Sequence, residues 1–253
     1  MKLTSVTTDG PCWVELGTTD PVAARAFYRE LFGWREDDAA RPADGDYVQM
    51  LLEDTPVAAI SPRYGPRQPT AWTVSFAVAD ADATAARVEK AGGSLLKEPT
   101  DVLDHGRFAV AADPSHAVFI LWQARTFKGA GVFNEPGSLG WVELVTRDPS
   151  GALAFYPAVF DWSVSPSDYY TQWGVAGQDF GGMPMTDDRS PEAPSYWLPY
   201  FSCADADLTV SRAVALGADV LVPASGMPGG RRTAVLRDPQ GAAFAVYHAP
   251  PVG

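Results

Sequence analysis

The sequence predicts an α+β fold made of four βαβββ units in two tandem domains. The main observation is a repeat: WVELGTTDPVAARAFYRELFGW at residues 13–34 returns as WVELVTRDPSGALAFYPAVFDW at 141–162. The offset is 128 (141 − 13), and 13 of the 22 positions are identical. A second helix pattern, after Asp80, returns after Asp205, at an offset of 125 (205 − 80). Matches this dense indicate duplicated structural units.

The first unit has the order strand, helix, three strands. Residues 13–18 read as a strand that leads into an Asp-Pro pair. Asp20 suits a helix N-cap, Pro21 suits the first helical position, and Gly33 suits the end of the helix. Three further strands are expected around residues 34–36, 47–52 and 56–60, separated by Gly, Pro and Asp turns. The following segment, SPRYGPRQP at 61–69, has the composition of a linker.

The second unit starts with the strand AWTVSFAVA at 71–79, the cap Asp80 and a helix over 81–91. Strands are expected near 94–97, 107–111 and 117–122. The second half repeats both units, except that Pro157 is expected to kink or shorten its first helix. We therefore predict a first domain over 1–125, a linker over 126–138 and a second domain over 139–253. Each pair of units should form a curved-sheet cup with its helices outside.

Composition limits the classes of partner. The net charge of −12 disfavours nucleic acid and anionic membrane surfaces. No run of 18 apolar residues and no basic-then-apolar start occurs, so neither a membrane span nor a signal peptide is expected. A cytoplasmic protein is the resulting expectation. Cys12 and Cys203 lie in apolar strand contexts and are read as buried free thiols rather than a disulfide.

These motifs resemble the vicinal oxygen chelate superfamily, which includes glyoxalase I, extradiol dioxygenases and bleomycin-resistance proteins. The resemblance is carried by the D-P-xxAxxFY pattern at the unit starts and by DPQGAAFAVY at 238–247. The string from Leu121 to Pro149 is similar to tandem actinobacterial members that are often labelled glyoxalase-like or hydroxylase. The resemblance implies tandem glyoxalase-like domains over nearly the whole chain, while the fold hosts many chemistries.

The resemblance also implies where a metal would bind. In metal-using relatives a His or Gln lies seven residues before the helix-capping Asp, and a Glu lies seven residues after the Asp of the D-P turn. The corresponding residues here are Trp13, Thr73, Trp141, Leu198, Ile120 and Ala245. None of them is a competent ligand. His105, His116 and His248 fall in turns or at a strand end, where surface positions are expected. We therefore predict no catalytic metal in the usual position and no cofactor.

Strand alternation predicts what faces the cup instead. The predicted lining comprises Trp13, Glu15, Thr73, Ser75, Val118, Ile120, Trp122, Trp141, Glu143, Leu198, Tyr200, Ser202, Ala243, Ala245 and Tyr247. Further walls are expected from Tyr47, Met50, Tyr169 and Trp173 on the middle strands. Arg107, Arg231 and Arg232 are candidate partners of the glutamates, or clamps for an anionic ligand. The aromatic residues could equally be packing residues of the core.

Glu15 and Glu143 are the candidate catalytic residues, because a carboxyl beside a Trp in an apolar cup has a raised pKa. The alternative, that each is paired and only holds strands together, stays open. The first hypothesis is metal-independent binding of a hydrophobic or aromatic small molecule, as in bleomycin-resistance proteins. The second is a metal-independent enzyme of secondary metabolism or detoxification, of lyase, isomerase or hydroxylase type. The third is a metalloenzyme with ligands such as Glu15, Glu143 or His105. The expected assembly is a monomer or a homodimer.

Overall fold

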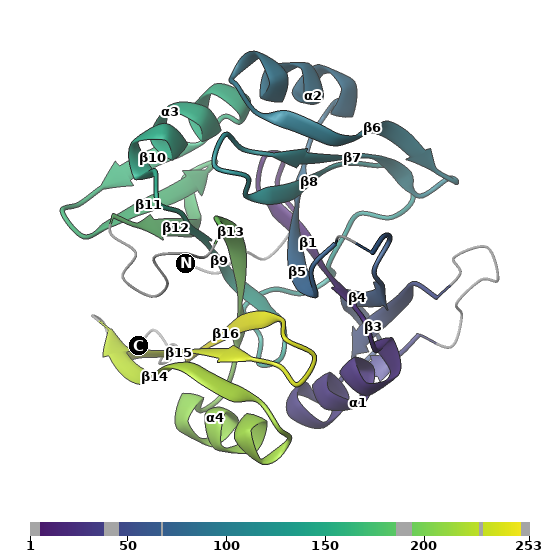
Figure 1. Cartoon of the computed structure of the whole chain (residues 1–253), viewed down its shortest axis with the longest axis vertical. Helices are drawn as coiled ribbons and strands as arrows, with labels where there is room; N and C mark the ends of the chain where they lie inside the picture. Colours follow the sequence, from purple (N-terminus) through teal and green to yellow (C-terminus); the bar gives the residue numbers. More distant parts are fainter. Residues whose placement is uncertain (1–5, 38–45, 67, 186–193, 228–229, 249–253) are drawn as a thin grey trace. The chain divides into compact units, whose positions relative to one another are not determined.

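The computed structural model describes residues 6–37, 46–66, 68–185, 194–227 and 230–248. Within these ranges four βαβββ sets follow one another, which confirms the predicted α+β fold (Figure 1). The first two sets are β1(Pro11–Thr18) α1(Pro21–Phe32) β2(Arg35–Glu36) β3(Val48–Leu52) β4(Thr55–Pro62) and β5(Ala71–Ala77) α2(Ala81–Lys90) β6(Ser94–Val102) β7(Gly106–Ala112) β8(Val118–Ala124). The last two are β9(Leu139–Val145) α3(Pro149–Val159) β10(Ser163–Pro166) β11(Tyr170–Val175) β12(Gln178–Pro184) and β13(Tyr196–Ser202) α4(Ala206–Ala215) β14(Asp219–Met227) β15(Arg231–Arg237) β16(Ala243–His248).

The repeated helix starts are formed by the local chemistry that the sequence predicts. The Asp20 carboxylate accepts a hydrogen bond from the Ala23 backbone amide, and Asp148 does the same for Gly151. Gly33 takes the left-handed conformation that ends α1. Helix α3 continues past Pro157 to Val159. It ends one residue before the position that corresponds to the end of α1, since 32 + 128 is 160.

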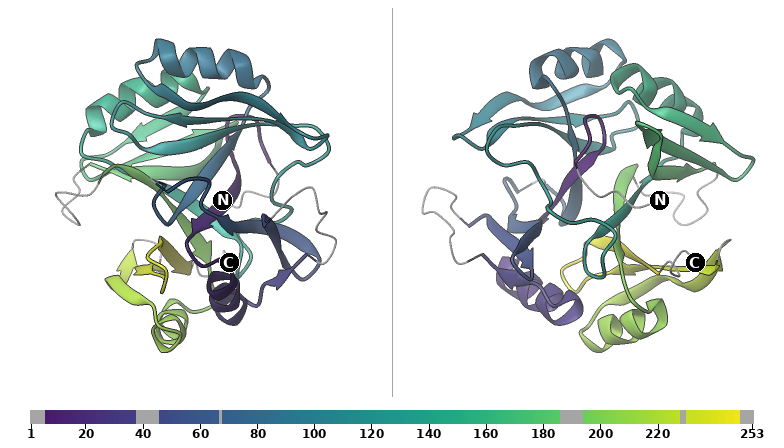
Figure 2. Two further views of the ribbon diagram at one scale, coloured as in Figure 1. Left: turned by 45° about the vertical axis from the view of Figure 1, so that its right-hand side comes forward. Right: turned by 180° about the vertical axis from the view of Figure 1, so that it is seen from behind.

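The strands form two eight-stranded sheets, ordered β2-β3-β4-β1-β5-β8-β7-β6 and β10-β11-β12-β9-β13-β16-β15-β14. The chain also divides into two compact units, and these units do not coincide with the two sheets. Unit 1 contains Met1–Trp13, Thr73–Gly129 and Val142–Leu198, and unit 2 contains Val14–Trp72, Ala130–Trp141 and Pro199–Gly253. In unit 1 helix α2 packs beside α3, and in unit 2 α1 packs beside α4 (Figures 1 and 2).

Each unit has an aromatic core organised by one buried tyrosine. In unit 2 the Trp72 indole donates to the Tyr28 hydroxyl at 2.9 Å, and Tyr28 donates to Asp238 at 2.9 Å. In unit 1 Trp197, Tyr156 and Asp113 form the same relay at 3.0 Å and 3.0 Å. Each aspartate also accepts backbone amides of its own D-P turn. Because every member has a partner, these polar groups can be buried at little cost.

Candidate functional site

Glu15 lies in the middle of β1, between two residues that are fully buried, Val14 and Leu16. Its neighbour across the parallel β1–β4 pairing is Ala59, which in turn lies opposite Gln49 of β3. Side chains alternate along a strand, so Glu15 points to the face opposite Val14 and Leu16. The glutamate is half-buried, whereas most of β1 is buried. That this face lines a ligand cup stays a prediction.

The environment of Glu15 favours its protonated form. Desolvation raises the pKa of the Glu15 carboxyl to about 7, against a partly opposing hydrogen bond from Tyr47. Burial disfavours the charged carboxylate, whereas a donated hydrogen bond stabilises it. A carboxyl that titrates near neutral pH can either accept a hydrogen bond from a ligand or exchange a proton with it.

A segment that composition marks as a linker completes this site. Tyr64, in the stretch after β4, exposes 70% of its surface. Desolvation and the nearby Glu15 carboxylate nevertheless raise the pKa of the Tyr64 phenol to about 12. Tyr64 as a whole is therefore largely exposed, and its phenol is close enough to Glu15 for their charges to interact. Sequence reasoning missed Tyr64, because nothing in a Gly/Pro-rich segment shows which way it folds.

The same segment brings Gln68 onto β1. The Gln68 side-chain oxygen accepts the Tyr64 backbone amide at 2.7 Å, and its backbone oxygen accepts from Arg63 at 3.0 Å. Its carboxamide nitrogen lies over Gly17, only 2.6 Å from where a Cβ would be. Gly17 is two residues from Glu15 on the same strand face. The site accordingly comprises Glu15, Tyr47, Tyr64 and Gln68, together with Ser61, whose side chain hydrogen-bonds the Tyr64 phenol, and all five belong to unit 2.

An open recess of about 370 Å³ lies at the end of β1 and β4. It is lined by Thr18, Thr19, Pro62, Arg63, Gly65 and Pro66. Arg63 and Gly65 flank Tyr64 in the chain, so the segment that carries Tyr64 also forms a wall of this recess.

Several aromatic residues predicted to line the cup are covered by the segment between the halves. In unit 1 the Trp13 ring meets Phe127 edge-on at 4.9 Å, and the Trp122 ring meets Phe127 at 6.0 Å. The Trp122 indole also donates to the Phe127 backbone oxygen. In unit 2 the Tyr247 hydroxyl donates to the Asn134 side chain at 2.8 Å. These side chains act in packing in this structure.

Other predicted lining residues are also buried. Ser75 lies opposite Ile120 in unit 1, and both are nearly inaccessible. Leu198 and Tyr200 on β13 are buried as well, and Thr73 is half-buried. On the middle strands, Met50 and Trp173 are fully buried. The Trp173 ring packs against Tyr156, Trp162 and Trp197 in the core of unit 1.

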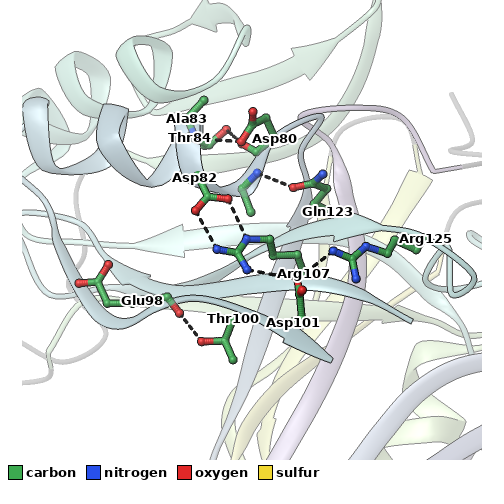
Figure 3. Close-up of polar contacts among 11 residues, drawn as sticks. Asp80, Asp82, Ala83, Thr84, Glu98, Thr100, Asp101, Arg107, Gln123 and Arg125 are labelled. Carbon is green, nitrogen blue, oxygen red and sulfur yellow. Dashed lines mark hydrogen bonds and ion pairs between the residues drawn. The ribbon is translucent and has the colours of Figure 1, made fainter. Parts of the chain in front are cut away.

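The predicted arginine clamps are held elsewhere. Arg107 makes a two-pronged ion pair with Asp82 at the start of α2, at 2.7 and 2.8 Å, and contacts Asp101 at 3.1 Å (Figure 3). Arg232, at the corresponding place in the fourth set, pairs with Asp207 of α4 at 2.8 Å. Arg231 is exposed at the start of β15. Both paired arginines thus tie a strand to its own helix.

Glu143 has the same strand position as Glu15 but a different neighbourhood. Its partner on β12 is Gly182, and a Cβ at Gly182 would lie 2.2 Å from the Tyr170 ring. Tyr170 therefore lies over the strand beside Glu143, which exposes only 6% of its surface. Tyr169, the residue named from the sequence, is 85% exposed. The repeated pattern Y-x-Q at 47–49 and 170–172 was the signal that could have identified Tyr170. Trp141 is half-buried.

The residues at the family's metal positions do not fit a metal ion. Among the described residues, no three His, Cys, Asp or Glu side chains gather as a metal site would require. Trp13 packs on Phe127, and Leu198 is wholly buried. Cys12 and Cys203 are buried free thiols, as predicted. No helix in the described ranges is long and apolar enough to cross a membrane.

Comparison with known proteins gives the family. A model described as "Glyoxalase/Bleomycin resistance protein/Dioxygenase superfamily" matches residues 11–121, and one described as "Glyoxalase-like domain" matches residues 141–247. The chain is 39% identical over 256 residues to "Anthracycline biosynthesis protein DauV" of Streptomyces sp. (strain C5), covering 93% of this chain and 92% of that protein. It is 38% identical over 253 residues to "Putative glyoxylase CFP32" of Mycobacterium tuberculosis, covering 95% of each.

Among solved structures, the Mn(II)-bound glyoxalase from Novosphingobium aromaticivorans superimposes with a TM-score of 0.68 at 16% identity. The match covers 97% of this chain and 83% of that one, and at this identity it supports the fold alone. The two family models and the two full-length relatives supply the stronger evidence. The chain belongs to the glyoxalase/bleomycin resistance protein/dioxygenase superfamily.

Proposed function

We propose that this protein binds a planar aromatic small molecule at the Glu15 site, without a metal ion. The observation that carries the proposal is that a half-buried carboxyl, Glu15, lies near enough to the exposed residue Tyr64 to raise the pKa of its phenol. Ligand sites typically combine apolar or aromatic contact surface with a few placed polar groups. The ring offers the stacking surface, and Glu15 with Tyr47 offers the polar contact.

The class of ligand follows from the relatives and from the site together. One relative is named for anthracycline biosynthesis, and anthracyclines are polycyclic aromatic quinones bearing hydroxyl groups. A hydroxyl group on a flat ring system complements a carboxyl beside a tyrosine face. We therefore expect an aromatic natural product of polyketide type, handled in secondary metabolism or detoxification.

Proton transfer by Glu15 is the second candidate. It is favoured by the pKa of about 7, because a general acid or base works best when its pKa is near the working pH. In this role the Glu15 carboxylate would take a proton from an acidic carbon of the ligand and return it at another atom, so that the ligand would be released as an isomer. Tyr47, as the hydrogen-bond partner of Glu15, would hold the carboxyl in place.

One titration tests both candidates. Quinizarin, a dihydroxyanthraquinone, is added to the protein with a chelator present, and quenching of tryptophan fluorescence is followed. We expect saturable binding that Glu15→Gln weakens about tenfold above neutral pH, where the wild-type carboxylate accepts the ligand hydroxyl group. Unchanged quinizarin on recovery supports binding, and a new product supports the enzyme. Absence of saturable binding, or equal affinity in Glu15→Gln, would overturn the site assignment.

A further inference from the structure

The Gln68 carboxamide presents a hydrogen-bond donor in a fixed direction. Its oxygen is taken by the Tyr64 backbone amide at 2.7 Å, which requires the oxygen to face Tyr64 and the nitrogen to face β1. That nitrogen lies directly over Gly17, and a side chain at position 17 would collide with it. The turn around it is closed by two backbone contacts, Gln68 to Gly65 at 3.1 Å and Arg63 to Thr18 at 3.2 Å. The donor is therefore preorganised on the Glu15 face.

A second hydroxyl group at the same place lies close to Tyr64. Ser61 is opposite Gly17 in the β1–β4 register and only 2% exposed. A hydrogen bond from its side chain lowers the pKa of the Tyr64 phenol, against the larger effects of desolvation and Glu15. Paired residues of parallel strands point to the same face, so Ser61 holds the Tyr64 hydroxyl group on the face of Glu15 and Gly17.

From these observations we infer that Gln68 is the specificity-determining residue of the site and selects aromatic ligands that carry a carbonyl group. The inference rests on the proposed function and deepens it. The Gln68 amide donates to the carbonyl oxygen, while Glu15 accepts from a hydroxyl group. Glu15 and Gly17 are about 6.5 Å apart along the strand, comparable with the width of a fused-ring system. A hydroxylated aromatic ketone or quinone meets both contacts.

Two substitutions remove the donor in independent ways. Gln68→Glu keeps the oxygen that accepts from Tyr64 and replaces the amide nitrogen by a second oxygen. Gly17→Ala leaves Gln68 intact but places a methyl group 2.6 Å from its nitrogen and so displaces the carboxamide. Gly17 does not have the positive φ that alanine would avoid, and the displaced atoms are the end of a flexible side chain. Neither change therefore disrupts the fold, which thermal unfolding of each variant verifies.

The test compares two ligands with the same ring system. Quinizarin has hydroxyl and carbonyl groups, and hydroxyanthracene has the hydroxyl group alone. We expect each substitution to weaken quinizarin binding at least tenfold and to change hydroxyanthracene binding less than twofold. The double variant should be no weaker than the single ones, since both act through one amide. Equal loss for both ligands, or no loss for either, overturns the role of Gln68 and leaves aromatic binding standing. Wild-type protein that binds neither ligand removes both proposals.

Discussion

Glu15 and Glu143 occupy the same place in the repeated sequence, yet their surroundings have diverged. Glu15 lies opposite Ala59, is half-buried and receives a hydrogen bond from Tyr47. Glu143 lies opposite Gly182 and is nearly inaccessible, and the Tyr170 ring lies over that glycine. Tyr47 and Tyr170 are themselves equivalent, since each stands two residues before a glutamine that pairs with the alanine or glycine. The residue on the neighbouring strand is thus Ala59 beside the more accessible Glu15, and Gly182 beside the covered Glu143.

The largest expected effect comes from adding a methyl group at Gly182. Gly182→Ala places a Cβ within 2.2 Å of the Tyr170 ring, so the ring must leave the strand. We expect a loss of about 3 kcal/mol in the free energy of unfolding, typical of overpacking, measured by denaturant titration. Tyr170 should then become more accessible to chemical modification. If stability and the accessibility of Tyr170 both stay unchanged, Gly182 is not what allows the ring to cover the site. Ala59→Gly is the matched reverse change in the Glu15 region.

The next effect concerns the pH dependence of stability. The pKa of Glu15 is about 7 in the folded protein and 4.5 as the ordinary value. The folded state therefore keeps a proton that the unfolded state releases, and stability falls as pH rises from about 5 to 8. We expect the loss in the free energy of unfolding between these pH values to be about 2 kcal/mol smaller in Glu15→Gln than in the wild type. Unfolding at several pH values measures it. Tyr47→Phe, which removes the opposing hydrogen bond, should shift the fall to higher pH. A Glu15→Gln profile that still matches the wild type would contradict the raised pKa.

The smallest effect separates two exposed tyrosines. Tyr64 lies beside Glu15, and Tyr169 precedes the tyrosine that covers the Glu143 region. We expect Tyr64→Ala to weaken quinizarin binding about fivefold to tenfold through loss of one stacking face, about 1 kcal/mol. Tyr169→Ala removes an even more exposed tyrosine and should leave the affinity unchanged. If Tyr169→Ala has the stronger effect, the ligand binds on the Glu143 side instead.

The repeat units, their helix caps and the strand position of Glu15 could be predicted because each depends on residues close in sequence. Asp20 caps α1 through an amide three residues away, and alternation places Glu15 opposite Val14 by geometry alone. The expectation for Tyr169 rests on its place near a middle strand and not on alternation, and the structure puts its neighbour Tyr170 over Gly182. An error of one residue in strand parity moves a side chain to the other face.

Long-range contacts decided what the local pattern could not. The predicted lining residues Trp13 and Trp122 meet Phe127, which comes from a segment with no pattern of its own. The stretch after β4, a linker by composition, folds back so that Tyr64 and Gln68 join Glu15. The buried hydroxyl of Tyr28 finds Asp238, 210 residues away.

The sequence by itself determined the four βαβββ sets and the face on which Glu15 lies, because hydrogen bonding along the backbone and strand alternation act over a few residues. Only the tertiary structure decided which carboxyl remains accessible and which tyrosine stands beside it. Those outcomes depend on desolvation and steric fit among segments distant in the chain, such as the Tyr170 ring over Gly182 and the Gln68 amide over Gly17.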